Sequence, residues 1–264
     1  MTASTASRCF RFLFLLFFFP RLAPAATVAS VTDGDTVRLA NGDAVRYLGI
    51  NTPERGQPFY DEARRFNEKL VLGKEIRLEM NGRARDRYGR LLARIYAGDI
   101  LVNARLVAEG LAHVYIMDTF DQAGEWIRLQ KTAQAERKGM WRNGVPGPLR
   151  ITRVNADAPG DDRRNPNGEY VRLCNVSDKP LDLTGFSVQD TARHRYVFPG
   201  GILEPGHVAT LSSGQGRDTI SNPRSLTFYW GAGPIWNNDE DVATLFAPDG
   251  KSIDTFRVGR EEAE

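Results

Sequence analysis

The amino-acid sequence predicts a β-rich protein of two domains, a five-stranded OB-type barrel with three helices followed by a β-sandwich. Three observations support this. The first part of the chain alternates β-branched runs with helical patterns, a Gly- and Pro-rich stretch at residues 143–148 interrupts every pattern, and the remainder shows only short strands and turns. A length of 264 residues accommodates two modest domains, and 26% charged residues are ordinary for a globular protein.

Residues 1–25 differ from the rest and predict a secretory signal peptide. Arg8 and Arg11 precede a short apolar block, and small residues follow that suit cleavage near Ala25–Ala26. A membrane anchor is the alternative, but the apolar block is only 8 residues long (12–19), against the roughly 20 needed to span a bilayer. We therefore expect a secreted or periplasmic protein without stable membrane insertion.

The charge is distributed unevenly along the chain. Residues 26–144 hold 19 basic and 16 acidic residues, a net charge of +3, whereas residues 145–264 hold 13 and 17, a net charge of −4. A mildly basic first domain is compatible with a polyanionic partner, but this excess is too small to establish one.

The cysteine content predicts a protein without a disulfide. Cys9 lies in the signal peptide, which leaves Cys174 alone in the mature chain. The residues around Cys174 read as a strand, so we expect a packed thiol rather than a reactive one. We expect the protein to be a monomer.

The first domain, residues 26–142, has the pattern of a strand meander interrupted by helices. Asp33-Gly34 and Asn41-Gly42 are typical of tight turns between strands. Alternating or β-branched runs predict strands at residues 27–32, 36–40, 44–48, 75–80 and 91–97. Apolar residues at helical spacing predict helices at residues 58–72, 102–109 and 121–138. Met140-Trp141 should then fold back onto the core.

Residues 143–148 (NGVPGP) predict a linker, and residues 149–258 a β-sandwich, followed by a tail at 259–264. No convincing helix follows the linker, and turns such as Pro248-Asp249-Gly250 separate the strands. The predicted strands are residues 149–154, 169–175, 185–189, 196–198, 208–212, 226–230, 241–246 and 252–257.

Oxygen-bearing side chains follow two strands of the first domain. Asp35 begins one strand after a turn, and Asn51 and Thr52 end another, where Pro53 restricts the backbone. If those strands are neighbours, a carboxylate, an amide oxygen and the Thr52 carbonyl converge, a ligand set that Ca²⁺ accepts. Taken alone, the string DGDT at residues 33–36 is more often only a turn.

Three charged residues nearby suit phosphodiester chemistry. Glu54 can take a proton from an attacking water, although an exposed Glu is usually only a solvated loop acid. Arg46 and Arg90 offer planar forks for phosphate oxygens, although Arg85 and Arg87 look similar in sequence. Only their positions in the fold can show which of these arginines contact phosphate.

The order of these motifs resembles the staphylococcal nuclease (thermonuclease-like) family. The motifs DGDT, R-x4-N-T-P-E and D-R-Y-G-R occur together in the expected sequence, and the match extends from about residue 28 to 141. The resemblance implies a five-stranded OB barrel with three helices. It also implies Ca²⁺-dependent hydrolysis of DNA and RNA that breaks the 5′-O–P bond and leaves 3′-phosphates.

The resemblance also assigns roles to individual residues. Asp35 and the Thr52 carbonyl would be metal ligands together with Asn51, Glu54 the general base, and Arg46 and Arg90 the phosphate clamp. Arg87 and Tyr88 would contact the substrate beside the scissile bond.

Two departures from the family pattern stand out. The family usually has Asp where Asn51 stands, so one ligand charge is missing and Ca²⁺ should bind more weakly. In the family, tyrosines after the second helix stack on the nucleotide base. The corresponding residues 113–118 read HVYIMD here, so the sequence does not establish this stacking contact. His113 itself is expected to be a surface histidine at a strand edge.

Residues 149–258 resemble the lamin-tail domain. The resemblance rests on NGEYVRLCN at 167–175, LDLTGF at 181–186, YVFP at 196–199, LEPG at 203–206 and YWG…IWNN at 229–238. It implies an immunoglobulin-like sandwich without a catalytic motif, and it leaves the partner of this domain open.

Two functions follow from the sequence. The first is a secreted, Ca²⁺-dependent, sugar-nonspecific nuclease acting on single-stranded DNA or RNA. The alternative is a catalytically weakened protein that uses the nuclease fold and the lamin-tail domain for attachment to nucleic acid or the cell envelope. The missing charge at Asn51 favours the alternative, whereas intact Arg46, Glu54 and Arg90 favour the enzyme.

Overall fold

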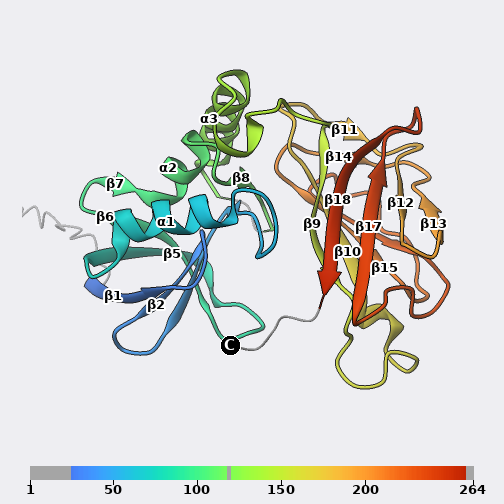
Figure 1. Cartoon of the computed structure of the whole chain (residues 1–264), viewed down its shortest axis with the longest axis horizontal. Coiled ribbons are helices and arrows are strands. Elements are labelled where there is room, and N and C mark those ends of the chain that lie inside the picture. The colour runs from blue at the N-terminus through green and yellow to red at the C-terminus, as the bar shows by residue number, and fades with distance from the viewer. Residues whose placement is uncertain (1–24, 118–119, 260–264) are drawn as a thin grey trace, which may run out of the picture.

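The computed structural model describes residues 25–117 and 120–259, which form two β-rich bodies side by side (Figure 1). The predicted signal peptide up to residue 24 and the predicted tail from residue 260 lie outside the described residues. In the part that is described, no helix is both long and apolar enough to cross a membrane.

The first body is a closed five-stranded barrel, as predicted. Its strands follow the order β3-β2-β1-β5-β6, and β3 also pairs with β6 in parallel, which closes the sheet on itself. The strands are β1 (Ala25–Val31), β2 (Thr36–Leu39), β3 (Ala44–Tyr47), β5 (Glu75–Arg85) and β6 (Leu91–Ala97), with β7 (Ile100–Leu101) beside β6. Alternate side chains fill the interior, and Val37, Val45 and Ile95 are fully buried.

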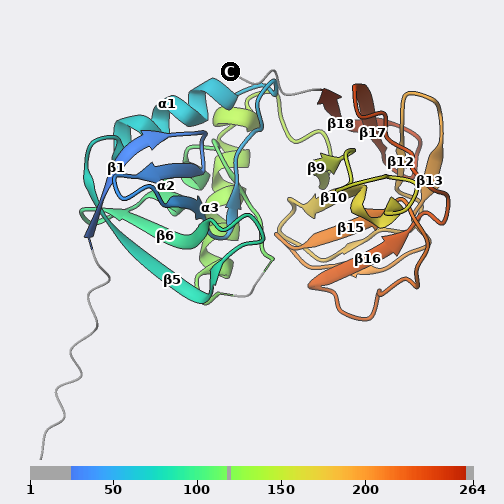
Figure 2. The same cartoon turned by 90° about the horizontal axis from the view of Figure 1, so that it is seen from below.

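The three predicted helices are present, each slightly shorter than its sequence pattern. They are α1 (Tyr60–Val71), α2 (Val102–Ala108) and α3 (Ala123–Ala135), and a short 3₁₀ turn η1 (Gly139–Trp141) follows. Figure 2 shows these helices packed beside the barrel strands. A two-strand ladder that the sequence did not indicate, β4 (Ile50–Asn51) with β8 (His113–Val114), joins the end of β3 to the chain after α2.

His113 is a correction to the expectation of a surface histidine. Its residue is 4% exposed, because β8 pairs with β4 inside the fold. Burial, together with the charge of Arg150, lowers the pKa of His113 to about 3. The ring is therefore neutral at physiological pH, and its Nδ1 lies 2.9 Å from the Val114 carbonyl oxygen.

The second body is a sandwich of two four-stranded sheets, β16-β15-β10-β9 and β13-β12-β17-β18, with a small β11-β14 ladder. Side chains of both sheets, including Leu173, Phe228 and Leu245, form one core. The strands are β9 (Leu149–Asn155), β10 (Tyr170–Asn175), β11 (Leu181–Asp182), β12 (Ser187–Gln189), β13 (Arg195–Val197), β14 (Ile202–Leu203), β15 (Val208–Ser212), β16 (Ser225–Tyr229), β17 (Glu240–Phe246) and β18 (Ser252–Gly259), and a 3₁₀ turn η2 spans Pro166–Gly168.

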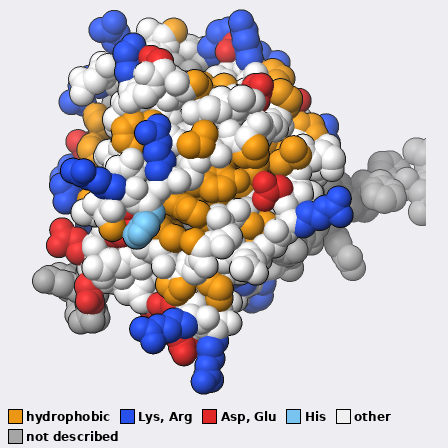
Figure 3. Space-filling view, turned by 90° about the vertical axis from the view of Figure 1, so that its right-hand side faces the viewer, with side chains coloured by type: hydrophobic (Ala, Val, Ile, Leu, Met, Phe, Trp, Pro, Cys, Tyr) orange, Lys and Arg blue, Asp and Glu red, His pale blue; other side chains and the backbone are white. Residues whose placement is uncertain are grey.

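The face of the sandwich that is turned away from the barrel carries apolar side chains. Figure 3 shows them gathered near the centre of that view. Exposed apolar residues of this domain include Val197, Ile202 and Ile220.

The two bodies meet along β10 and the β14–β15 turn. Cys174 is fully buried, as predicted, and packs in one cluster with Trp141, Ala133 and Val176. Trp141 thus folds back onto a seam between the domains and not only onto the barrel. The Gln130 side chain donates a hydrogen bond to the Val176 carbonyl oxygen at 2.7 Å across this seam.

The backbones of the two bodies come into direct contact at Gly206. The Ile116 N–H donates to the Gly206 carbonyl oxygen at 2.7 Å. Gly206 has φ +74°, and a Cβ there would lie 2.9 Å from Val114 Cγ1 and 3.0 Å from Ile116 Cδ1. The absence of a side chain therefore lets the sandwich domain touch the barrel domain.

We expect Gly206→Ala to destabilise the protein more than Gly250→Ala. Gly250 has φ +83° with nothing within 4 Å, so both variants carry a left-handed backbone cost of about 1–2 kcal/mol. Only Gly206→Ala adds overpacking at the seam, for about 1–3 kcal/mol more. Urea unfolding of both variants measures the difference, and equal losses would show that the seam tolerates a methyl group.

Candidate active site

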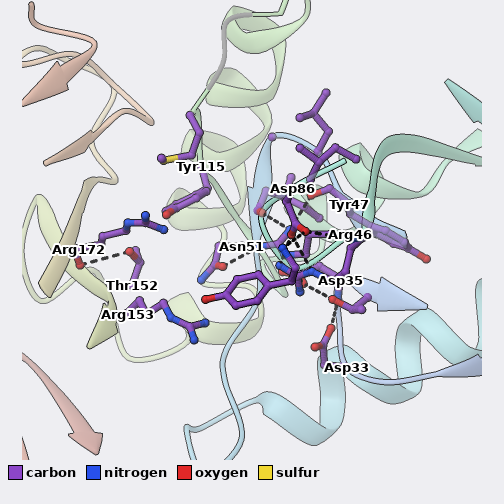
Figure 4. Close-up of a pocket in the computed structure, with 18 of the residues that line it drawn as sticks. Asp33, Asp35, Arg46, Tyr47, Asn51, Asp86, Tyr115, Thr152, Arg153 and Arg172 are labelled. Carbon is purple, nitrogen blue, oxygen red and sulfur yellow. Dashed lines mark hydrogen bonds and ion pairs between the residues drawn. The ribbon is translucent and has the colours of Figure 1, made fainter. Parts of the chain in front are cut away.

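One cavity of about 280 Å³ lies where the barrel domain meets the sandwich domain. Side chains from both bodies line it, and Figure 4 shows them facing one another across the space. Of the residues predicted from the sequence to form a site, those at the cavity are Asp35, Arg46, Asn51, Glu54, Arg87, Tyr88 and Arg90. Thr52 lies beside it and binds Asp35 through its backbone N–H at 2.8 Å.

Arg46, in β3, makes four polar contacts within the site. Its Nε lies 3.0 Å from Asp35 Oδ1, and its Nη2 donates to Asn51 Oδ1 at 2.8 Å. Its Nη1 donates to the carbonyl oxygens of Tyr47 and Ile50, at 2.6 and 2.9 Å. These contacts use four of the five N–H donors of a guanidinium, so one remains for an incoming phosphate without rearrangement.

The three predicted metal-ligand residues are brought together. Asp35 is 4% exposed, and the Asn51 amide donates to the Thr52 carbonyl oxygen at 3.3 Å. Their oxygens are of the hard type that Ca²⁺ prefers. Among the described residues, however, no three His, Cys, Asp or Glu side chains gather into a ready-made cage.

Asp33 and Glu54 add negative charge around Asp35. Burial, reinforced by repulsion from Asp35, raises the pKa of Asp33 to about 7. Burial and then Asp35 also raise the pKa of Glu54, while Arg46, Arg153 and Arg90 oppose the rise. Burial is the larger cause of both shifts, and the repulsion from Asp35 shows that these carboxylates lie close enough together for a bound cation to stabilise them.

Asp86 positions the predicted phosphate ligand Arg90. Its Oδ2 accepts a hydrogen bond from Arg90 Nε at 2.8 Å and lies 2.8 Å from Arg90 Nη2 in an ion pair. Its Oδ1 accepts the backbone N–H of Tyr88 at 2.9 Å and that of Arg90 at 3.0 Å. Gly89, at φ +79°, lets the loop turn around this carboxylate. The sequence prediction had assigned no role to Asp86, although its spacing to Arg90 was visible.

Arg87 connects the two domains. Its Nη2 donates to the hydroxyls of Tyr88 and Tyr170, both at 2.5 Å. Tyr170 belongs to β10, whereas Tyr88 is 56% exposed at the mouth of the cavity. Arg87 therefore lies at the predicted substrate site and also holds the sandwich domain against it.

The sandwich domain supplies part of the cavity wall, which sequence reasoning had missed. Its contributions are Thr152, Arg153, Tyr170 and Arg172. The barrel adds Tyr115 and Met117 beyond the predicted set. Tyr170 and Arg172 are two residues apart on one strand and therefore share a face, a signal readable in the sequence, but nothing there indicated which surface that face would meet.

Comparison with known proteins divides the chain in the same way. Residues 44–143 match the family model described as staphylococcal nuclease homologue, and residues 143–260 match the lamin tail domain model. The thermonuclease of Staphylococcus intermedius is 33% identical over 124 residues, which cover 43% of this chain and 74% of that protein.

Two relatives from Bacillus subtilis (strain 168) match the same part of the chain. Endonuclease YncB is 35% identical over 127 residues, covering 44% of this chain and 60% of the relative. The SPbeta prophage-derived endonuclease YokF is 35% identical over 131 residues, covering 45% of this chain and 44% of the relative. The chain thus spans about half the length of these two relatives.

Asn67 supports the turn that carries Asp33 and Asp35. It is fully buried on α1, accepts a hydrogen bond from the Tyr47 hydroxyl at 2.8 Å, and donates to the Asp33 carbonyl oxygen at 3.2 Å. A buried polar network of this kind ties the helix to the site.

We expect Asn67→Ala to lower the free energy of unfolding by about 1–3 kcal/mol, because it leaves the buried Tyr47 hydroxyl and the Asp33 carbonyl unpaired. Tyr47→Phe is the partner in a double-mutant cycle followed by urea unfolding. In the Asn67→Ala background it should cost clearly less than in the parent. Additive losses would contradict the coupling.

Proposed function

The chain belongs to the staphylococcal nuclease family of phosphodiester-hydrolysing enzymes, and on that premise we propose that it is a secreted or periplasmic, Ca²⁺-dependent nuclease. It would hydrolyse both DNA and RNA at the 5′-O–P bond and leave 3′-phosphates. The observation that carries the proposal is the convergence of Asp35, Arg46, Glu54 and Arg90 on one cavity.

The residues of the cavity suit attack by water on a phosphodiester. Glu54 accepts a proton as the water oxygen forms a bond to phosphorus, and the bond from phosphorus to the 5′-oxygen breaks. The 5′-oxygen takes up a proton and leaves as a hydroxyl, while the phosphate stays on the 3′-side. Arg90, held by Asp86, and the remaining donor of Arg46 stabilise the charge that develops on the phosphate oxygens.

The cation would be held by Asp35, Asn51 and the carbonyl oxygen of Thr52. Bound there, Ca²⁺ supplies positive charge beside the phosphate oxygens. The carboxylates of Asp33 and Glu54 support a cation at this place, because both lie close enough to Asp35 for its charge to add to the effect of burial on their pKa values. Asn51 contributes no charge, so Asp35 is the only carboxylate in the ligand set.

Single-stranded DNA or RNA is the proposed substrate of a monomeric enzyme. The cavity has a wall on each side, one from the barrel and one from the sandwich domain. A single strand can lie in such a space and reach Glu54.

One observation favours the alternative of a catalytically weakened binding protein. Asn51 Oδ1 accepts a hydrogen bond from Arg46, so the amide oxygen that would bind the cation already has a donor. Under this alternative the same cavity would retain nucleic acid without cutting it.

Glu54→Gln separates the two functions. We expect the parent to cleave single-stranded DNA with Ca²⁺ and not with chelator, and the variant to be slower by about 10²–10⁴-fold, because the amide cannot accept the proton. Gel analysis of a 5′-labelled oligonucleotide measures the rate, and a 3′-phosphate end identifies the bond. Glu62→Gln, an exposed residue of α1, is the matched control. No Ca²⁺-dependent cleavage by the parent, or equal rates, would reject the enzyme assignment.

Asn51→Asp tests the ligand set. A second carboxylate beside Asp35 should lower the Ca²⁺ concentration that gives half-maximal rate, since an anionic oxygen replaces a neutral one. Calorimetric titration of Ca²⁺ gives the affinity independently of turnover and should show the same direction. An unchanged affinity would place Asn51 outside the ligand set.

A further inference from the structure

We propose that the sandwich domain contributes a phosphate-binding subsite, in which Arg153 and Arg172 bind a backbone phosphate of the substrate strand next to the one that is cut. The inference rests on the proposed function, because it assigns part of the same substrate to a second domain. The chemistry that it requires is an anionic strand with at least two phosphates.

The strand geometry places both arginines on the wall that faces the barrel. Arg172 and Arg153 are direct cross-strand partners on β10 and β9. On β10, Val171 and Leu173 point into the sandwich core, so Arg172 points the other way, on the face of Tyr170. Figure 4 shows Arg153 and Arg172 extending toward the cavity across from Asn51.

The two guanidinium groups lack the partners that such a position normally requires. In the described ranges, neither is seen in an ion pair with an acid, and both Nε atoms are buried without a hydrogen-bond acceptor. The Tyr115 hydroxyl is the polar side-chain neighbour of Arg172, and it carries no negative charge to balance the guanidinium. Arg172 lies 4.7 Å from the Tyr170 ring centroid, a contact that leaves its donors in the ring plane free for an anion. Like charges directly opposite one another on a sheet are destabilising. A phosphate between them would supply acceptors and offset the repulsion.

The subsite is continuous with the reaction centre. Arg153 and Arg172 line the same cavity as Glu54, and so do Arg46 and Arg90. A strand that places one phosphate at Arg46 and Arg90 can therefore present a neighbouring phosphate to the sandwich domain.

The seam between the domains fixes this arrangement. Arg87 donates to the Tyr170 hydroxyl, and β10 continues from Tyr170 and Arg172 to the buried Cys174. Arg172 thus lies on a strand that is anchored to the barrel at both ends of the contact, and Arg153 lies opposite it on β9. Little ordering is needed when the substrate binds.

Binding and cleavage by the double variant Arg153→Gln/Arg172→Gln test the proposal. In a Glu54→Gln background, fluorescence anisotropy with a labelled 12-nucleotide single strand should show roughly tenfold or more weaker binding. Because a phosphate contact is lost, the slope of log K against log salt should fall by about 0.7. In the otherwise native chain, kcat/KM should fall for the 12-mer and stay unchanged for a dinucleotide with one phosphodiester.

Two controls keep the test specific. Arg224→Gln removes an exposed arginine of the same domain that does not line the cavity, and it should change neither binding nor the salt slope. Arg153→Lys/Arg172→Lys keeps the charge and should retain most of the binding. Urea unfolding should show the glutamine variant at least as stable as the parent, because two opposed like charges are gone.

The outcomes separate the two proposals. Unchanged affinity and salt slope in the double variant, or an equal loss for the dinucleotide, would overturn the subsite. If the parent does not cleave, the proposed nuclease activity is rejected. The anisotropy measurement still tests the phosphate-binding subsite, because it measures binding and does not depend on cleavage.

Discussion

Arg46 in β3 joins the turn between β3 and β4 to the acidic side chains of the cavity. Its guanidinium binds the carbonyl oxygens of Tyr47 and Ile50, which flank the turn between β3 and β4, and also the side chains of Asp35 and Asn51. Asp35 is almost inaccessible to water and has Asp33 and Glu54 as neighbours. Without the arginine, three carboxylates would share a poorly solvated space, which is strongly unfavourable. The turn and the acidic site therefore depend on the same cation.

This dependence limits what Arg46 can do for a substrate. A guanidinium with most of its N–H donors bound to the protein offers a fixed positive charge, but it cannot donate two parallel hydrogen bonds to a phosphate. Arg90 is different, because its partner Asp86 lies on the same loop and its side chain is about one-third exposed. The contacts within the protein therefore differ between the two arginines, and Arg90 is the more accessible one, although sequence alone makes them look equivalent.

The sequence predicted the barrel, its three helices and the sandwich because each depends on local periodicity and turn chemistry. It also placed Asp35, Asn51 and Thr52 together correctly, since strand ends joined by tight turns leave few alternatives. It could not predict that Arg153 and Arg172 line the same cavity as Glu54. That juxtaposition depends on how two finished domains dock, through contacts such as Gln130 with Val176 that carry no local signal. The error at His113 has the same origin, because the short β4–β8 pairing that buries it is a long-range contact.

Residues 142–148, between η1 and β9, form a short tether. At its last residue, the Pro148 carbonyl oxygen accepts a hydrogen bond from the Val176 N–H at 2.8 Å. A tether of this length keeps the sandwich domain at an effective concentration of about millimolar beside the barrel. A seam made of one small apolar cluster and a few hydrogen bonds can then remain closed, whereas the same contact between separate chains would dissociate at cellular dilution. Covalent continuity is thus what allows a second domain to serve as a permanent wall of the cavity through so modest an interface.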